Sequence, residues 1–134
     1  MQGDVVPQVL SFLQQQALYL QALGVDRHRI VLDPGIGFGK TVEQNFALLA
    51  RQAELLTSGH AWLAGWSRKS SLGAVTGLPV EQRLHASVAA AVLAVERGAR
   101  IVRVHDVAAT VQALAVWRAM QAAQATTTST EGTP

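Results

Sequence analysis

Three short apolar segments recur along the chain at intervals of about 30 to 40 residues, at 29–33, 61–64 and 101–105. Their β-branched and aliphatic residues are typical of buried parallel strands. A helical pattern lies between each pair of segments, and alternating strands and helices of this kind form parallel sheets with right-handed crossovers. The spacing therefore predicts an α/β fold with three parallel strands and flanking helices.

The intervening segments carry the periodicity and the boundary residues of helices. Residues 4–23 have apolar side chains at helical spacing, with Asp4 as a possible cap and Gly24 just beyond the end. A second helix is predicted over 42–57, where Thr41 and Gln44 form a capping box. One or two short helical turns are expected near 70–80, followed by a long helix over 81–97.

Two features of the second half bear on assembly. The small residues of 81–97 permit close approach of another element, which suits either a tight helix–sheet layer or a subunit contact. Asp106 can cap the final helix, whose inner face is predicted to include Val107, Val111 and Leu114. Residues 125–134 have almost no apolar content and are predicted to form a disordered tail, leaving 1–124 as one domain.

Composition narrows the class of protein. The chain has 134 residues, 49% hydrophobic and 15% charged, as expected for one soluble domain. The absence of cysteine excludes disulfides, thiolate catalysis and cysteine-ligated metals. Eleven basic residues are scattered among nine acidic ones, which is too diffuse for nucleic-acid binding. With no membrane-length apolar run and no signal pattern, we expect a cytoplasmic protein.

The first predicted strand ends in a carboxylate and then a glycine-rich loop. Asp33 is followed by glycines at 35, 37 and 39, which permit positive φ angles and close approach of a ligand to the backbone. Phe38 within this loop is suited to cover a flat ring. A phosphate-binding Walker loop is disfavoured because Pro34 stands where it needs glycine, and the spacing of the dinucleotide fingerprint is also absent. A plain strand-to-helix connector with a capping aspartate remains an alternative.

Polar residues also follow the other two strands, and the carboxyl ends of parallel strands share one face. Arg103 and His105 are two residues apart and are predicted to project together as a clamp for phosphate or pyrophosphate. The alternative is that Arg103 merely pairs with a carboxylate such as Asp106 and that His105 is a core histidine with satisfied hydrogen bonds. After the second strand, Lys69 precedes Ser70 and Ser71, which are placed to meet a ligand carboxylate.

Asp33 is suited to accept paired hydrogen bonds from a guanidine-like ring edge, such as that of a pterin or guanine. His28, His60 and His85 have no partner at metal-ligand spacing, so the residues themselves predict no metal site.

Residues 32–40, 65–70 and 101–106 together closely resemble the dihydropteroate synthase family, in motif, order and spacing. The resemblance extends from Met1 to about Met120. It implies an eight-stranded (β/α) barrel, of which this chain is similar to the carboxyl-terminal part. The implied reaction joins 6-hydroxymethyl-7,8-dihydropterin pyrophosphate to 4-aminobenzoate, releasing pyrophosphate, through a pterin-stabilised cation.

The resemblance also implies roles for the residues at the strand ends. Asp33 and Lys69 are the implied catalytic residues, which bind the pterin and stabilise its developing charge. Arg103 and His105 are implied to hold pyrophosphate. The other implied substrate-binding residues are Gly65 beneath the ring, Phe38 near both substrates, and Arg68 with Ser70 near the aminobenzoate carboxylate.

The sequence also departs from the family. Motifs of the family's first half, including the asparagine that helps hold Mg²⁺ and two mobile loops, are not found, and Ala86 stands where a glycine is expected. Three strands cannot close a barrel, so their inward side chains and their edges are expected to face water. We therefore expect either an incomplete chain that needs its missing half and is inactive alone, or an oligomer that covers those edges. The complete enzyme is expected to use Mg²⁺, to be a homodimer and to be a sulfonamide target. The alternatives are a pterin-binding methyltransferase-type domain and a non-catalytic binding fragment.

Overall fold

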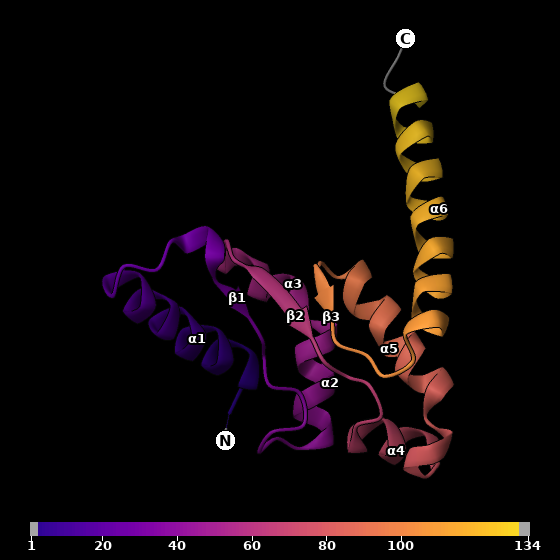
Figure 1. The fold of residues 1–134 in the computed structure, drawn as a ribbon, viewed down its shortest axis with the longest axis horizontal. Coiled ribbons are helices and arrows are strands. Elements are labelled where there is room, and N and C mark those ends of the chain that lie inside the picture. The colour runs from indigo at the N-terminus through magenta and orange to yellow at the C-terminus, as the bar shows by residue number, and fades with distance from the viewer. Residues whose placement is uncertain (1–2, 132–134) are drawn as a thin grey trace.

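A parallel three-stranded sheet in the order β1-β2-β3 forms the centre of the protein (Figure 1). The computed structural model describes the backbone of residues 3–131 and the side chains of residues 3–126. The strands are β1 (Val31–Leu32), β2 (Ala61–Ala64) and β3 (Ile101–Val102). Val31 is paired with Ala61, and Leu63 with Ile101. The predicted α/β class and parallel strands are confirmed.

The helices follow the predicted order. They are α1 (Val5–Ala22), α2 (Val42–Ala50), α3 (Gln52–Leu55), α4 (Ser70–Thr76), α5 (Leu84–Glu96) and α6 (Val107–Glu131), with 3-10 turns η1 (Arg27–Arg29), η2 (Leu56–Ser58) and η3 (Val80–Gln82). Asp4 caps α1 by accepting a hydrogen bond from the backbone N of Val6, at 3.1 Å. The predicted capping box of Thr41 and Gln44 is present at the start of α2.

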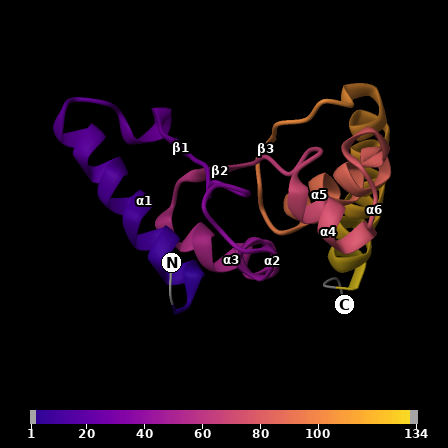
Figure 2. The same cartoon turned by 90° about the horizontal axis from the view of Figure 1, so that it is seen from below.

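The hydrophobic core lies between the sheet and the helices on one of its faces. Trp62 from β2, Leu48 from α2 and Leu55 from α3 are each at most 1% exposed. Viewed from below, the opposite face of the sheet is not covered by a described helix (Figure 2). Val31 and Ile101 are 44% and 43% exposed. The expectation that three strands leave barrel-lining side chains open to water is therefore confirmed.

The strands and the second helix are shorter than predicted. The predicted strands 29–33 and 101–105 reduce to two residues each, because β1 and β3 pair only with β2 among the described residues. The predicted helix 42–57 is interrupted at Arg51, whose backbone has φ −109° and ψ 23°. The Arg51 guanidinium there bonds to the carboxylates of Asp4 and Glu54.

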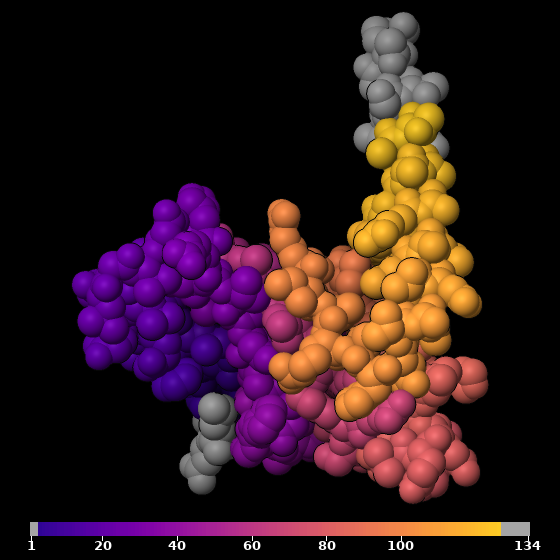
Figure 3. Space-filling view, in the orientation of Figure 1, coloured from indigo at the N-terminus to yellow at the C-terminus, as the bar shows by residue number. Residues whose placement is uncertain are grey.

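Helix α6 differs most from the prediction. Its helical backbone continues to Glu131, whereas residues from 125 onward were predicted to be disordered; residues 132–134 lie outside the described part. Extending an existing helix costs little, since nucleation has already been completed. Figure 3 shows the part of α6 coloured yellow projecting beyond the body of the molecule.

The inner face of α6 is also rotated from the predicted one. Val107 and Val111 are each 59% exposed, which corrects their assignment, while Leu114 is half-buried. Thr110 is instead 3% exposed, and its hydroxyl donates to the backbone O of Asp106 at 2.8 Å, so the polar group is satisfied in this buried position. None of the described helices combines the length and apolar character needed to cross a membrane.

Candidate functional site at the carboxyl ends of the strands

The loops that follow the three strands meet at one end of the sheet. Arg103, after β3, places its Nη1 3.5 Å from Oδ2 of Asp33, after β1. The guanidinium also lies over Gly65, after β2: a Cβ at this glycine would be only 2.5 Å from Nη2 of Arg103. Three residues that are distant in sequence therefore share one small region, as predicted from the positions of the strand ends.

The glycine-rich loop after β1 is held in a defined shape. Gly35, Gly37 and Gly39 all have positive φ angles, between +64° and +87°. Asp33 Oδ1 accepts a hydrogen bond from the backbone N of Gly35 at 2.8 Å, while Lys40 Nζ donates to the backbone O of Gly35 at 2.8 Å. Asp33 thus caps its own loop, as the connector interpretation expected, but its second oxygen faces Arg103.

Lys69 connects the loop after β2 to the glycine-rich loop. Its Nζ donates to the backbone O of Ile36 and lies 5.0 Å from the centroid of the Phe38 ring. Burial lowers the pKa of Lys69, and the positive charges of Arg103 and Lys40 lower it further, while Asp33 opposes them. The Phe38 side chain is 70% exposed and is therefore accessible to a ligand.

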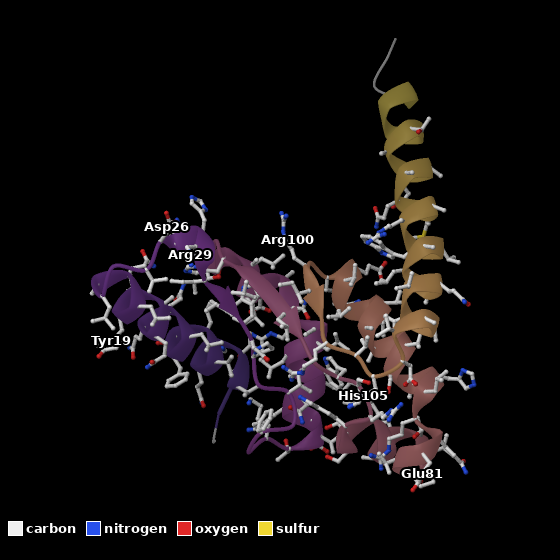
Figure 4. The ribbon with its side chains drawn as sticks, viewed as in Figure 1. Tyr19, Asp26, Arg29, Glu81, Arg100 and His105 are labelled. Carbon is white, nitrogen blue, oxygen red and sulfur yellow. The ribbon has the colours of Figure 1, made fainter. Side chains whose placement is uncertain are left out.

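Arg103 and His105 both lie beyond the last residue of β3, so the alternating geometry of a strand does not align them, and they take different partners. Arg103 faces Asp33. The ring Nδ1 of His105 is 2.7 Å from the Ser67 hydroxyl, which also accepts from the backbone N of His105. The predicted alternating strand geometry at 103–105 is thus replaced by loop contacts. Figure 4 places His105 and Arg100 at opposite ends of the sheet. His105 is exposed, so it is not a core histidine.

Asp106, which the sequence suggested as a partner for Arg103, is instead paired with Arg68. The Nη2 of Arg68 donates to Oδ1 of Asp106 at 3.0 Å. Arg103 does pair with a carboxylate, as the alternative expected, but the partner is Asp33 and not Asp106. Arg68 is also the one non-glycine residue with positive φ among those described, at +58°. Its backbone N donates to the Ser87 hydroxyl at 2.8 Å, and its backbone O accepts from Arg83. Helix α5 and the turn before it therefore stabilise this strained turn.

The two serines at the start of α4 face different environments. Ser70 is exposed, whereas Ser71 is 2% exposed and accepts a hydrogen bond from Asn45 Nδ2 at 2.9 Å. The prediction that both would face a ligand carboxylate is therefore corrected for Ser71. The sequence patterns did not single out Asn45, Lys40 or Ser67. Lys40 and Ser67 could have been identified from their positions within the strand-end loops, whereas no sequence pattern indicated Asn45.

A cavity of about 190 Å³ lies beside the site, between α1 and the glycine-rich loop. It is lined by Val9, Phe12, Leu13, Asp33, Pro34, Gly35 and Lys40. A larger cavity of about 780 Å³ lies where the strands begin, and includes Arg100 and Trp117. No group of three potential metal ligands occurs among the residues with described side chains.

A sequence model of the family described as "Pterin binding enzyme" matches residues 1–105. The dihydropteroate synthase of Haemophilus influenzae is 47% identical over 116 residues, which cover 87% of this chain and 42% of that relative. The Escherichia coli K12 enzyme is 40% identical over 121 residues, covering 90% and 43%. The chain thus spans less than half the length of these relatives.

Solved structures agree with these matches. A dihydropteroate synthase from Xanthomonas albilineans, in complex with 7,8-dihydropteroate, superposes with a TM-score of 0.89 at 49% identity, covering 91% of this chain and 47% of that one. A Yersinia pestis dihydropteroate synthase with a sulfonamide drug complex gives 0.89 at 39% identity, covering 92% and 45%.

Proposed function

The chain belongs to the family of pterin-binding enzymes, and on this basis we propose that it carries part of the active site of a dihydropteroate synthase. Such enzymes have a (β/α)8 barrel fold, and this chain corresponds to part of that barrel. The proposed reaction joins 6-hydroxymethyl-7,8-dihydropterin pyrophosphate to 4-aminobenzoate, giving 7,8-dihydropteroate and pyrophosphate. The supporting observation is the convergence of Asp33, Lys69 and Arg103 at the carboxyl ends of three strands.

The pterin is proposed to bind between the first two strand-end loops. Asp33 accepts hydrogen bonds from the amino-pyrimidine edge, since its carboxylate is 37% exposed and only one of its oxygens is bonded to its own loop. Lys69 donates to the carbonyl side of the ring, and Gly65 provides the close approach beneath it. As the bond to pyrophosphate breaks, the carboxylate of Asp33 stabilises the positive charge that develops on the pterin.

Pyrophosphate and 4-aminobenzoate are proposed to lie on either side of this pterin site. Arg103 is 56% exposed and presents a guanidinium to pyrophosphate, together with the ring of His105. Arg68 and Ser70 lie toward the carboxylate of 4-aminobenzoate, and the exposed ring of Phe38 covers the substrates. A sulfonamide is proposed to compete with 4-aminobenzoate at this position.

Mg²⁺, which the family implies, does not fit the residues described. Asp33 faces Arg103, which is proposed to hold pyrophosphate, but a single carboxylate that also caps Gly35 N supplies too few oxygen ligands for Mg²⁺. Because no set of three potential ligands is present among these side chains, we derive no step through the ion. Its protein ligand is proposed to lie in the remaining βα units.

Catalysis is proposed to require those remaining units, because the chain spans less than half of its relatives and one face of its sheet is open. The test measures pterin binding by fluorescence and pyrophosphate release with and without 4-aminobenzoate. Binding without release is expected for this chain, and release is expected when the missing units are supplied. Failure to bind 6-hydroxymethylpterin would refute the proposed site.

Two alternatives predict different ligands. A methyltransferase-type domain that binds methyl-tetrahydrofolate has no pyrophosphate to hold, so it gives no role to Arg103 and His105. A non-catalytic binding fragment would bind pterin but would not release pyrophosphate even with the missing units present. Binding of inorganic pyrophosphate would contradict the methyltransferase-type alternative. Release of pyrophosphate after the missing units are supplied would contradict the non-catalytic fragment.

The complete enzyme is proposed to be a cytoplasmic homodimer. An apolar groove of about 400 Å³ lies between α5 and α6 and includes Leu84, Val88 and Val116. Val116 is 73% exposed and Val111 is 59% exposed, so α6 presents apolar side chains that a second copy of the chain would cover. The variant Val116→Lys should convert the dimer to a monomer in light scattering, whereas an unchanged dimer would place the interface elsewhere.

A further inference from the structure

A buried amide joins two of the three loops of the candidate site. Asn45, in the first half of α2, is 1% exposed. Its Oδ1 accepts a hydrogen bond from the backbone N of Gly37 at 3.0 Å, and its Nδ2 donates to the Ser71 hydroxyl at 2.9 Å. Ser71 is 2% exposed and is the second residue of α4. One side chain therefore connects the glycine-rich loop to the start of α4.

This connection determines how Lys69 sits against the glycine-rich loop. Lys69 is the N-cap of α4, two residues before Ser71, and its Nζ donates to the backbone O of Ile36. A Cβ on Gly37 would lie 3.2 Å from Cδ of Lys69, so the lysine stem lies close along the loop backbone. A shift of either segment would change the separation of Lys69 from Asp33.

We propose that Asn45 is a positioning residue for pterin recognition. It sets the distance between Lys69 and the glycine-rich loop that contains Asp33 and Phe38. The inference rests on the pterin site proposed above. An amide is suited to this role because it accepts from the backbone N of Gly37 and donates to Ser71 at the same time. Loss of either contact leaves a buried polar group unsatisfied.

The first test compares Asn45→Ala with a matched control, Gln52→Ala. Gln52 is also a buried amide, 4% exposed, but its Nε2 donates to the backbone O of Ala94, away from the site. With 6-hydroxymethylpterin as the probe, Asn45→Ala should weaken affinity by roughly tenfold, the size expected for a lost buried hydrogen-bond network. Gln52→Ala should keep affinity within about twofold although it also loses a buried bond. Equal losses in both variants would overturn the proposal.

The second test needs no ligand and measures backbone amide exchange. Asn45→Ala should accelerate exchange at Gly37 and at Leu72, whose backbone N–H groups donate to Asn45 Oδ1 and to the backbone O of Lys69, while Gln52→Ala should leave both amides protected. Adding Ser71→Ala to Asn45→Ala should weaken pterin affinity no further, because both changes break the same connection. Unchanged protection at Gly37 in Asn45→Ala, or fully additive losses, would refute the bridge.

The two tests also separate this inference from the proposed function. Wild-type protein that fails to bind 6-hydroxymethylpterin would refute the pterin site and with it the role of Asn45 in pterin recognition. Wild-type protein that binds pterin, with Asn45→Ala binding equally well, would refute the positioning role alone.

Discussion

Replacement of Gly65 by alanine tests the proposed role of Arg103 without removing the arginine. The new Cβ would lie 2.5 Å from Nη2 and 3.1 Å from Cζ of Arg103, so the guanidinium must leave its position beside Asp33. Gly65 does not have a positive φ, and alanine is therefore compatible with the backbone. The obstacle is the end of a flexible side chain, so displacement of that side chain, rather than unfolding, is the expected response.

The expected change in stability is close to zero. An exposed ion pair such as Arg103–Asp33, with side chains 56% and 37% exposed, contributes about 0–1 kcal/mol. Replacing glycine by alanine at a compatible position stabilises by about 0.4–1 kcal/mol through the unfolded chain. The two effects nearly cancel, and thermal unfolding should show a similar midpoint for variant and wild type.

Binding of inorganic pyrophosphate should change much more. A hydrogen bond to a charged group is worth about 1.5–3 kcal/mol, so loss of one from Arg103 weakens affinity by about ten- to a hundredfold. Calorimetric titration measures this loss. In an Arg103→Ala background the further change Gly65→Ala should have little effect on pyrophosphate affinity. Unchanged pyrophosphate binding in Gly65→Ala, or a further large loss in the double variant, would refute the assigned position of the guanidinium.

Three further outcomes are expected. Lys69→Ala should weaken binding of 6-hydroxymethylpterin while leaving the helix content in circular dichroism unchanged; unaltered affinity would contradict its role. Hydrogen bonds from Arg51 lower the pKa of Asp4 below its ordinary 3.8, so this interaction stabilises the fold above pH 3.8 and is lost as the pH falls further. The urea midpoint should therefore fall less between pH 7 and pH 3 in Arg51→Gln than in wild type, and an equal fall would argue against this pair. Leu55→Ala should cost about 2–5 kcal/mol in urea unfolding because the side chain is fully buried, whereas the neighbouring Leu56→Ala, 38% exposed, should cost less; similar costs would contradict the described core.

Much of the architecture follows from local patterns. The order of strands and helices, the cap at Asp4 and the capping box at Thr41 depend on neighbouring residues, and they were predicted correctly. The gathering of Asp33 and Arg103 was also predictable, because parallel strands place their carboxyl ends at one edge.

The failures of prediction arose where distant partners decide local structure. The break at Arg51 coincides with bonds to Asp4, which is far away in sequence. Residues 103–105 do not continue as a strand, since β3 has only one neighbouring strand among the described residues. The inner face of α6 depends on its packing against α5, which places Thr110 inward and Val107 outward.

The sequence by itself determined which chemical groups follow each strand, because motif spacing and the parallel βα pattern are local properties of the chain. Only the tertiary structure decided which groups are paired. It assigned Asp106 to Arg68, His105 to Ser67 and Asn45 to both Gly37 and Ser71. The physical reason is that a hydrogen bond depends on the distance and direction between two atoms, and these arise only after separate elements have packed together.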